Sequence, residues 1–308
     1  MDKYGIQIEL LKEIDALCRV NGLTYILYKD IARIASENDP ARYNSIVVNI
    51  AMTRGEALKL RELIYAQDRQ DRFIEGIEDN ENYLRWSFIY GDVNTTDFNL
   101  VKTKNQANKG IHINIDFIEK VHSKVNHGKI KAYRKLRKLT CINEDDWSLW
   151  YAKAAARITP ILGKERIMKK YVSVRSSNDI EKWQDIRNYE VVSINNRNVY
   201  TTLLNEIKEI ELCGTKFIVP SKLEKYLEDT GTRTIEEIKK AKASSRRMTS
   251  TVIGYKEVME DPRVLSIMKE ANEHYEVIVD KKKKNKKAQS KIEELVKLVT
   301  KIVNDTEA

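Results

Sequence analysis

The sequence predicts an α/β (α+β) protein with a small mixed sheet, followed by a mainly helical second half. Residues 45–52 (SIVVNIAM) are rich in β-branched side chains, which favour strands. Residues 110–121 (GIHINIDFIEKV) alternate in polarity, and a period of two is typical of a strand with two different faces. Residues 5–20 place apolar side chains at helical spacing, which indicates a helix with one buried face.

The opening helix leads into two strands and a second helix. Asn21-Gly22 supplies a natural end for the first helix, and residues 23–27 (LTYIL) form the first short strand. The segment 28–44 is polar, and we expect it to be a connection. Thr53 follows the second strand and offers a cap for a helix that begins near Arg54.

Two further strands complete residues 1–121, which we expect to form the first domain. Residues 82–94 (NYLRWSFIYGDVN) alternate and end in a turn. In the segment 110–121, the odd positions put Ile and Phe on one face. The other face carries His112, Asn114, Asp116 and Ile118. The first domain is therefore a small α/β sheet with one open face.

Helices are expected to dominate residues 122–280, the second region. The candidate helices cover residues 145–172, 197–212 and 250–274. Near 213–231 we expect the chain to return to the first domain. There a short extended piece is followed by a helix that Ser221 caps and Gly231 ends. Residues 281–308 form a basic linker and an amphipathic C-terminal helix.

The composition is that of a globular protein with a heavily charged surface, with 42% hydrophobic and 33% charged residues among 308. No apolar stretch reaches the length of a transmembrane helix. The three cysteines are far apart, so we expect reduced thiols in a cytoplasmic protein rather than a metal site. Residues 281–308 hold nine Lys and four Asp or Glu, which is +5 of the net +9. The pI alone therefore does not lead us to expect a nucleic-acid partner.

Three segments occur in an order that matches a known family. They are ELLKEIDALCRVNGLTYIL, GIHINIDFIEKV and GTKFIVPSKLEKYLEDTG. Together they resemble the LicD family, the phosphocholine transferases that decorate bacterial cell-surface glycans. The resemblance spans residues 6–235 in patches. It implies a nucleotidyltransferase-type core that moves a phospho-alcohol from a nucleotide donor to a glycan or teichoic acid acceptor, with Mg²⁺ or Mn²⁺ if the protein is active.

The chain departs from this family where the metal would bind. The family has a glycine-rich turn after the first strand, but residues 28–33 (YKDIAR) contain no glycine. Val47 and Asn49 stand at the two positions where the family has aspartates on one face of the second strand. On the third strand, the family's aspartate falls on Asn114 in one register and on Asp116 in another. Both registers place it on the same face.

The resemblance implies a site around Asp116, which would be the metal ligand, with Asn49 and Asn114 as further catalytic positions. The substrate-binding positions that follow from the same comparison are Lys29, Arg33, Ser45 and His112. We favour a structural, hydrogen-bonded role for Asn49, because Val47 beside it cannot bind a metal. For Asp116, metal binding and pairing with a basic residue remain equally open.

Three functions follow. The first is a LicD-like transferase with normal, reduced or lost activity. The second is an inactive relative that acts as a binding or regulatory protein. The third is a basic adaptor for nucleic acid or for an anionic membrane at the inner face of the cell membrane. It would use residues 281–308 and residues 120–138, which hold eight basic residues and no acidic one. If the segment 120–138 binds no such partner, we expect it to be a charged helix face that is exposed to solvent.

Overall fold

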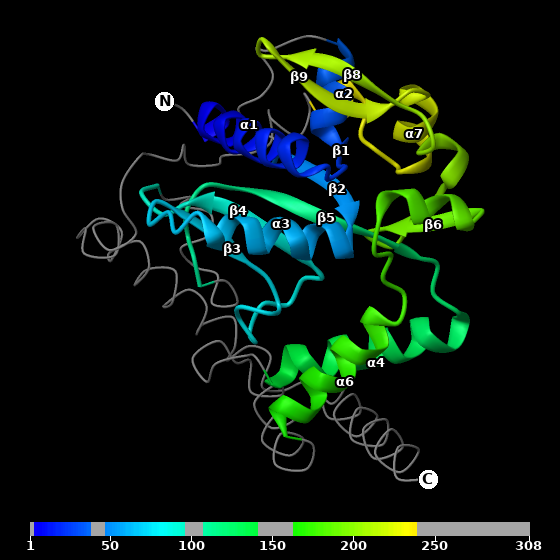
Figure 1. Ribbon diagram of the computed structural model, residues 1–308. Helices are drawn as coiled ribbons and strands as arrows, with labels where there is room; N and C mark the ends of the chain where they lie inside the picture. The colour runs from blue at the N-terminus through cyan, green and yellow to red at the C-terminus, as the bar shows by residue number, and fades with distance from the viewer. Residues whose placement is uncertain (1–2, 38–46, 96–106, 141–162, 239–308) are drawn as a thin grey trace, which may run out of the picture. The chain divides into compact units, whose positions relative to one another are not determined.

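The computed structural model describes residues 3–37, 47–95, 107–140 and 163–238 (Figure 1). The chain divides into two compact units. Unit 1 contains Met1–His122 and Asn178–Tyr255, and unit 2 contains Ser123–Ser177 and Lys256–Ala308. The helix expected at 250–274 and the basic segment 281–308 lie outside the described residues. Among the described residues, no helix is both long and apolar enough to cross a membrane.

Unit 1 is built on a mixed sheet of seven strands, which confirms the predicted fold class. The strand order is β1-β2-β5-β4-β3, and β6 pairs with β5 while β7 pairs with β6. The strands are β1 (Ile26–Tyr28), β2 (Asn49–Thr53), β3 (Arg72–Glu75), β4 (Ser87–Asp92), β5 (His112–Lys120), β6 (Val191–Ile194) and β7 (Arg197–Tyr200). The central strand β5 runs parallel to β2 and antiparallel to β4 and β6.

Helices α1 (Lys3–Asn21) and α3 (Arg54–Ala66) pack against β5 and against each other (Figure 1). Tyr90 pairs with Ile113 across β4 and β5, and its hydroxyl donates to Glu13 on α1 at 2.6 Å. Phe117, further along β5, lies 5.9 Å from the guanidinium of Arg54 on α3. The odd positions of β5 therefore face these helices, and the even positions point to the opposite face of the sheet.

Local sequence sets the ends of both helices as predicted. Gly22 follows α1 with φ of 63°, a conformation that glycine adopts without strain. The next amide, of Leu23, donates to Cys18 O at 2.9 Å and satisfies one of the last carbonyls of the helix. Thr53 caps α3, because its hydroxyl accepts the backbone N–H of Glu56.

The helix expected over residues 197–212 is wrong, because these residues form β7, the 3₁₀ turn η4 (Thr201–Leu203) and β8 (Ile207–Leu212). Strand β8 forms a separate hairpin with β9 (Thr215–Pro220). Two-residue turns connect the strands, Asn195-Asn196 between β6 and β7 and Cys213-Gly214 between β8 and β9. All four turn residues have positive φ, which is the geometry of the tightest hairpins.

Other differences are smaller. The segment expected as a polar connection contains α2 (Asp30–Glu37), and α7 (Leu223–Asp229) follows β9. Gly231 lies just beyond α7 with φ of 61°, so its predicted role at the helix end is confirmed. Ser221 is not the cap: Lys222 occupies that position, with no side-chain hydrogen bond to the helix. Another 3₁₀ turn, η3 (Trp183–Asn188), precedes β6.

The described part of unit 2 consists of α4 (Lys124–Thr140) and α6 (Lys164–Ser176), which lie side by side (Figure 1). The helix expected at 145–172 falls largely outside the described residues, and α6 covers its end. Apolar side chains of both helices are buried, among them Ile130, Leu136 and Ile167. The guanidinium of Arg137 lies 4.7 Å from the centre of the Tyr171 ring, which joins the two helices by a cation–π contact.

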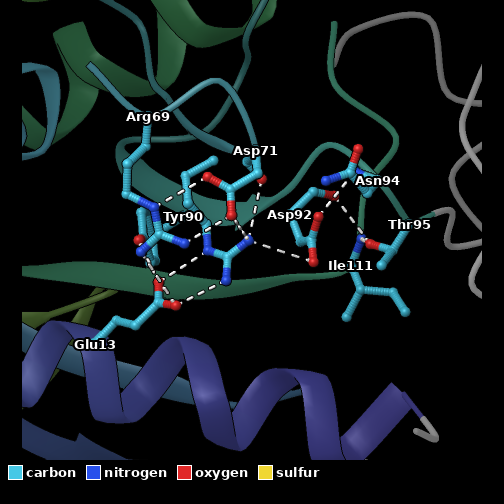
Figure 2. Close-up of polar contacts among 9 residues, drawn as sticks. Glu13, Arg69, Asp71, Tyr90, Asp92, Asn94, Thr95 and Ile111 are labelled. Atoms are coloured by element: carbon cyan, nitrogen blue, oxygen red, sulfur yellow. Dashed lines mark hydrogen bonds and ion pairs between the residues drawn. The ribbon is translucent and has the colours of Figure 1, made fainter. Parts of the chain in front are cut away.

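A network of charged side chains ties α1 to β3 and β4 (Figure 2). Glu13 accepts a hydrogen bond from Arg72 at 2.7 Å and lies 3.4 Å from Arg69. Arg72 also contacts Asp71 at 2.9 Å. Burial would raise the pKa of Glu13, but hydrogen bonds from Arg72 and Tyr90 and the charges of both arginines outweigh burial and hold that pKa below its usual value. Each charge in the network has a partner, so we assign it a structural role.

Candidate functional site

The polar face of β5 and the end of β2 carry the residues that the sequence singled out. Parallel pairing of the two strands places Asn49 opposite Asn114, and Ala51 opposite Asp116. The side chains of Asn49, Asn114 and Asp116 are buried, each residue being 6–7% exposed. Since Asn114 and Asp116 are two residues apart on a strand, they share one face. The register therefore brings the predicted site residues together, with Asn114 rather than Asp116 opposite Asn49.

The two asparagines bind each other. Asn114 Nδ2 donates to Asn49 Oδ1 at 3.0 Å, and Asn49 Nδ2 donates to the carbonyl of Val47 at 2.6 Å. Arg85, in the loop before β4, reaches Asn114 Oδ1 at 3.4 Å. Asn49 is thus a hydrogen-bonded polar group in a buried strand. Its side-chain amide links β2 to β5 by a hydrogen bond.

Lys29 and Asp116 form the ion pair at the centre of the site. Lys29 Nζ lies 2.8 Å from Asp116 Oδ2, and it also lies 4.6 Å from the centre of the Tyr28 ring. The Lys29 side chain is 34% exposed and that of Asp116 is 10% exposed, so one end of the pair is open to solvent. Lys29 sits in the turn between β1 and α2 with φ of 60°, a conformation that is uncommon for a residue with a Cβ.

Buried tyrosines surround the carboxylate of Asp116. Burial raises the pKa of Tyr28 and of Tyr226, and the Asp116 charge adds to both shifts. Burial also raises the pKa of Tyr83 to about 12, with a smaller contribution from Asp116. The Tyr28 hydroxyl donates to Ile194 O at 3.3 Å, and the other hydroxyls also lie near polar partners. These phenols stay protonated at neutral pH, and their buried rings give the site a low dielectric constant.

The remaining predicted substrate-binding residues lie elsewhere or outside the described residues. Arg33 donates to Glu224 on α7 at 2.6 Å, so its guanidinium is engaged away from the Lys29–Asp116 pair. His112 lies on the same face of β5 as Asn114, where its Nδ1 contacts Gly110 O at 3.1 Å. Ser45 falls in the segment 38–46, which is not described. Lys29 is therefore the one predicted phosphate-facing residue that the described structure places beside Asp116.

The donor atoms at this site do not fit a divalent metal. Mg²⁺ is held by carboxylates together with phosphate oxygens or water. Here Asp116 supplies a single carboxylate that already contacts an ammonium group, and the two amides are bonded to each other. Within residues 3–37, 47–95, 107–140 and 163–238, no group of three or more His, Cys, Asp or Glu side chains could hold a metal ion.

Sequence reasoning missed two arginines near the pair. Arg85 contacts Asn114, and the positive charge of Arg197 in β7 acts on Tyr28. Both arginines are exposed, and neither belongs to a motif that marked it in advance. With Lys29, which contacts Asp116, they bring three positive charges to the residues of this site. The arrangement can attract an anion and bind it by charge and hydrogen bonds.

Comparison of this chain with family models, with curated proteins and with solved structures finds no match.

Proposed function

We propose that this protein binds a phosphate-bearing ligand of the kind that LicD-like transferases use, a nucleotide-activated alcohol, and does not transfer the phospho group. The observation that carries the proposal is the contact of 2.8 Å between Lys29 Nζ and Asp116 Oδ2. It puts an ammonium group next to the one carboxylate that a metal would need. In place of a metal ion, the positive charge of Lys29 attracts the phosphate. Lysine binds phosphate as a point charge.

The charge distribution supports binding rather than catalysis. Transfer of a phospho group depends on cations that neutralise charge as it develops in the transition state, usually Mg²⁺ ions held by carboxylates. In the described site Val47 and Asn49 supply no carboxylate, while Lys29, Arg85 and Arg197 supply positive charge. The protein would then act as a binding or regulatory member of a cell-surface glycan pathway, the setting that the LicD resemblance implies.

Titration calorimetry with CDP-choline tests the proposal. We expect binding in EDTA that is unchanged by added Mg²⁺ or Mn²⁺, and no release of CMP on long incubation. Lys29→Met removes the ammonium and should abolish binding. The matched control Lys59→Met changes an exposed lysine on α3 and should bind as the wild type does.

Two results would overturn the proposal. Binding that requires a divalent metal, accompanied by release of CMP, would show a working transferase. The absence of binding to CDP-choline and to other CDP-alcohols, with and without metal, would remove the nucleotide-ligand proposal altogether.

A further inference from the structure

Helices α4 and α6 carry an unusual share of the protein's charge. Together they hold 12 Lys and Arg and one Glu, a net charge of +11. The whole chain has a net charge of +9, so the residues outside the two helices sum to −2. The basic character of the protein is therefore concentrated in these two helices, in addition to the basic C-terminal segment, and the remainder is acidic.

Each helix displays a compact cluster of exposed positive side chains. The α4 cluster is Lys131, Arg134 and Lys135, and the α6 cluster is Arg166, Lys169 and Lys170. All six side chains are exposed. Both clusters have the spacing i, i+3, i+4, which makes their members neighbours on the helix surface. Like charges at this spacing destabilise a helix, so helix stability does not account for the pattern.

The helices that carry the two clusters pack side by side. Burial raises the pKa of Tyr133 on α4, and the charge of Arg166 on α6 opposes that shift. Arg166 on α6 is thus near Tyr133 on α4. Glu165, the single acidic residue of the two helices, contacts Lys169 at 2.7 Å, and both side chains are at least 77% exposed.

We propose that the outer surface of α4 and α6 binds the phosphate backbone of duplex nucleic acid, without reading its sequence. Counterion release from the phosphates supplies the affinity in such complexes. From Lys124 to Lys135 the helix axis advances about 16 Å, and this length faces about five phosphates of one strand. The exposed side chains are mainly lysines, which suit phosphate contacts rather than base contacts.

Other partners fit the two helices less well. Single-stranded nucleic acid is usually held by stacking on exposed aromatic rings, but Tyr133 and Tyr171 are 7% and 2% exposed. A helix that lies on a membrane inserts an apolar face, and the apolar faces of α4 and α6 are largely buried. Protein interfaces are depleted in lysine, which accounts for six of the eight exposed basic residues among the described side chains of α4 and α6.

Fluorescence anisotropy with the full chain tests this inference, using labelled 20-base-pair DNA duplexes of two unrelated sequences and an RNA duplex. The test variant carries Lys131→Gln, Arg134→Gln and Lys135→Gln, since glutamine keeps the helix propensity. The control variant carries Lys59→Gln, Lys208→Gln and Lys222→Gln, three exposed lysines of unit 1. Circular dichroism and thermal midpoints establish that both variants are folded.

We expect the two DNA sequences to bind equally and the affinity to fall steeply with salt. The test variant should bind about tenfold more weakly, and its slope of log K against log [salt] should be smaller by about 2.7, because each lost phosphate contact removes ~0.9. The control variant should keep the wild-type slope. The inference fails if both variants lose affinity equally, if no duplex binds, or if phosphatidylglycerol vesicles or polyglutamate bind as tightly as the duplexes do.

Discussion

Asn49 and Asn114 are bonded amide to amide across β2 and β5, although 65 residues separate them in the sequence. Each amide can donate and accept. Asn114 donates to Asn49, so a buried donor and a buried acceptor satisfy each other. A pair of carboxylates at these positions would repel each other without a cation between them. The two amides therefore stabilise the site in the absence of any ligand.

Asn114→Leu should destabilise the protein. Leucine has a similar size but no donor, so the buried Oδ1 of Asn49 loses the hydrogen bond that it accepts at 3.0 Å. We expect the free energy of unfolding to fall by about 1–3 kcal/mol, measured by urea denaturation. Asn205→Leu, at an exposed position, should change it by no more than about 0.5 kcal/mol. Equal effects of the two substitutions would contradict the structural role of the amide pair.

The double variant Lys29→Gly, Asn49→Asp should gain a metal site. Glycine adopts the positive φ of residue 29 without strain, and its introduction frees the carboxylate of Asp116. The aspartate introduced on β2 adds a second carboxylate on the neighbouring strand, which suits Mn²⁺. Binding of Mn²⁺, followed by electron paramagnetic resonance, should appear in the double variant and remain weak in either single variant. If the single variant Asn49→Asp binds Mn²⁺ equally well, Lys29 does not block the site.

Glu13→Gln should lower the free energy of unfolding by about 1–3 kcal/mol at pH 7, because it weakens charge-assisted hydrogen bonds to Arg72 and Tyr90. The pKa of Glu13 is held below its ordinary value of 4.5. Its contribution is therefore complete above pH 4.5 and is lost as the pH falls through the folded-state pKa. Urea denaturation at several pH values measures this difference. Glu9→Gln, which removes an exposed contact on the same helix, should have little effect.

Asp179→Asn should flatten the dependence of stability on pH between about pH 4 and pH 6. Burial raises the pKa of Asp179 from 3.8 to about 6, against the opposing effect of Arg54 on α3 and with help from Glu119 and Glu181. Across this window the folded protein holds a proton that the unfolded chain has released. The wild type therefore loses stability as the pH rises, by up to about 1.4 kcal/mol per pH unit from this group.

Urea denaturation from pH 4 to pH 7 would reveal the change in slope. Asp68→Asn, at an exposed position, serves as the control and should leave the wild-type slope intact. A slope in Asp179→Asn that equals the wild-type slope would mean that other groups carry the pH dependence.

The elements with strong local signals were predictable. The alternation of residues 110–121 predicted β5 and its two faces. Gly22 predicted the end of α1, and Thr53 predicted the start of α3. The helix predicted for residues 197–212 was wrong, because the apolar spacing of this segment also fits a helix. The deciding signals were the pairs Asn195-Asn196 and Cys213-Gly214, which adopt the positive φ values of two-residue hairpin turns. The eight residues of α2 are too few for a periodic pattern to stand out from a polar connection.

The candidate site was only partly predictable. The residues on β2 and β5 could be named from their spacing, because strand periodicity places them on a shared face. The contact between Lys29 and Asp116 joins residues 87 positions apart, and no local pattern encodes such a distance. Arg85 and Arg197 come from loop and edge positions whose approach to the site depends on the whole sheet. Long-range packing, rather than residue type, decides these contacts.

The central position of β5 has a consequence for the order in which this protein can fold. Its neighbours come from residues 49–53, 87–92 and 191–194, so β2 cannot pair with β5 until β3 and β4 have been synthesised between them. Contacts between residues far apart in sequence slow folding, because the entropy of closing long loops is lost before the contacts form. During synthesis, the first 92 residues hold four strands that lack the strand between β2 and β4. Synthesis must therefore reach residue 120 before β5 can join β2 to β4. A chain that stalls earlier exposes strand edges that can aggregate.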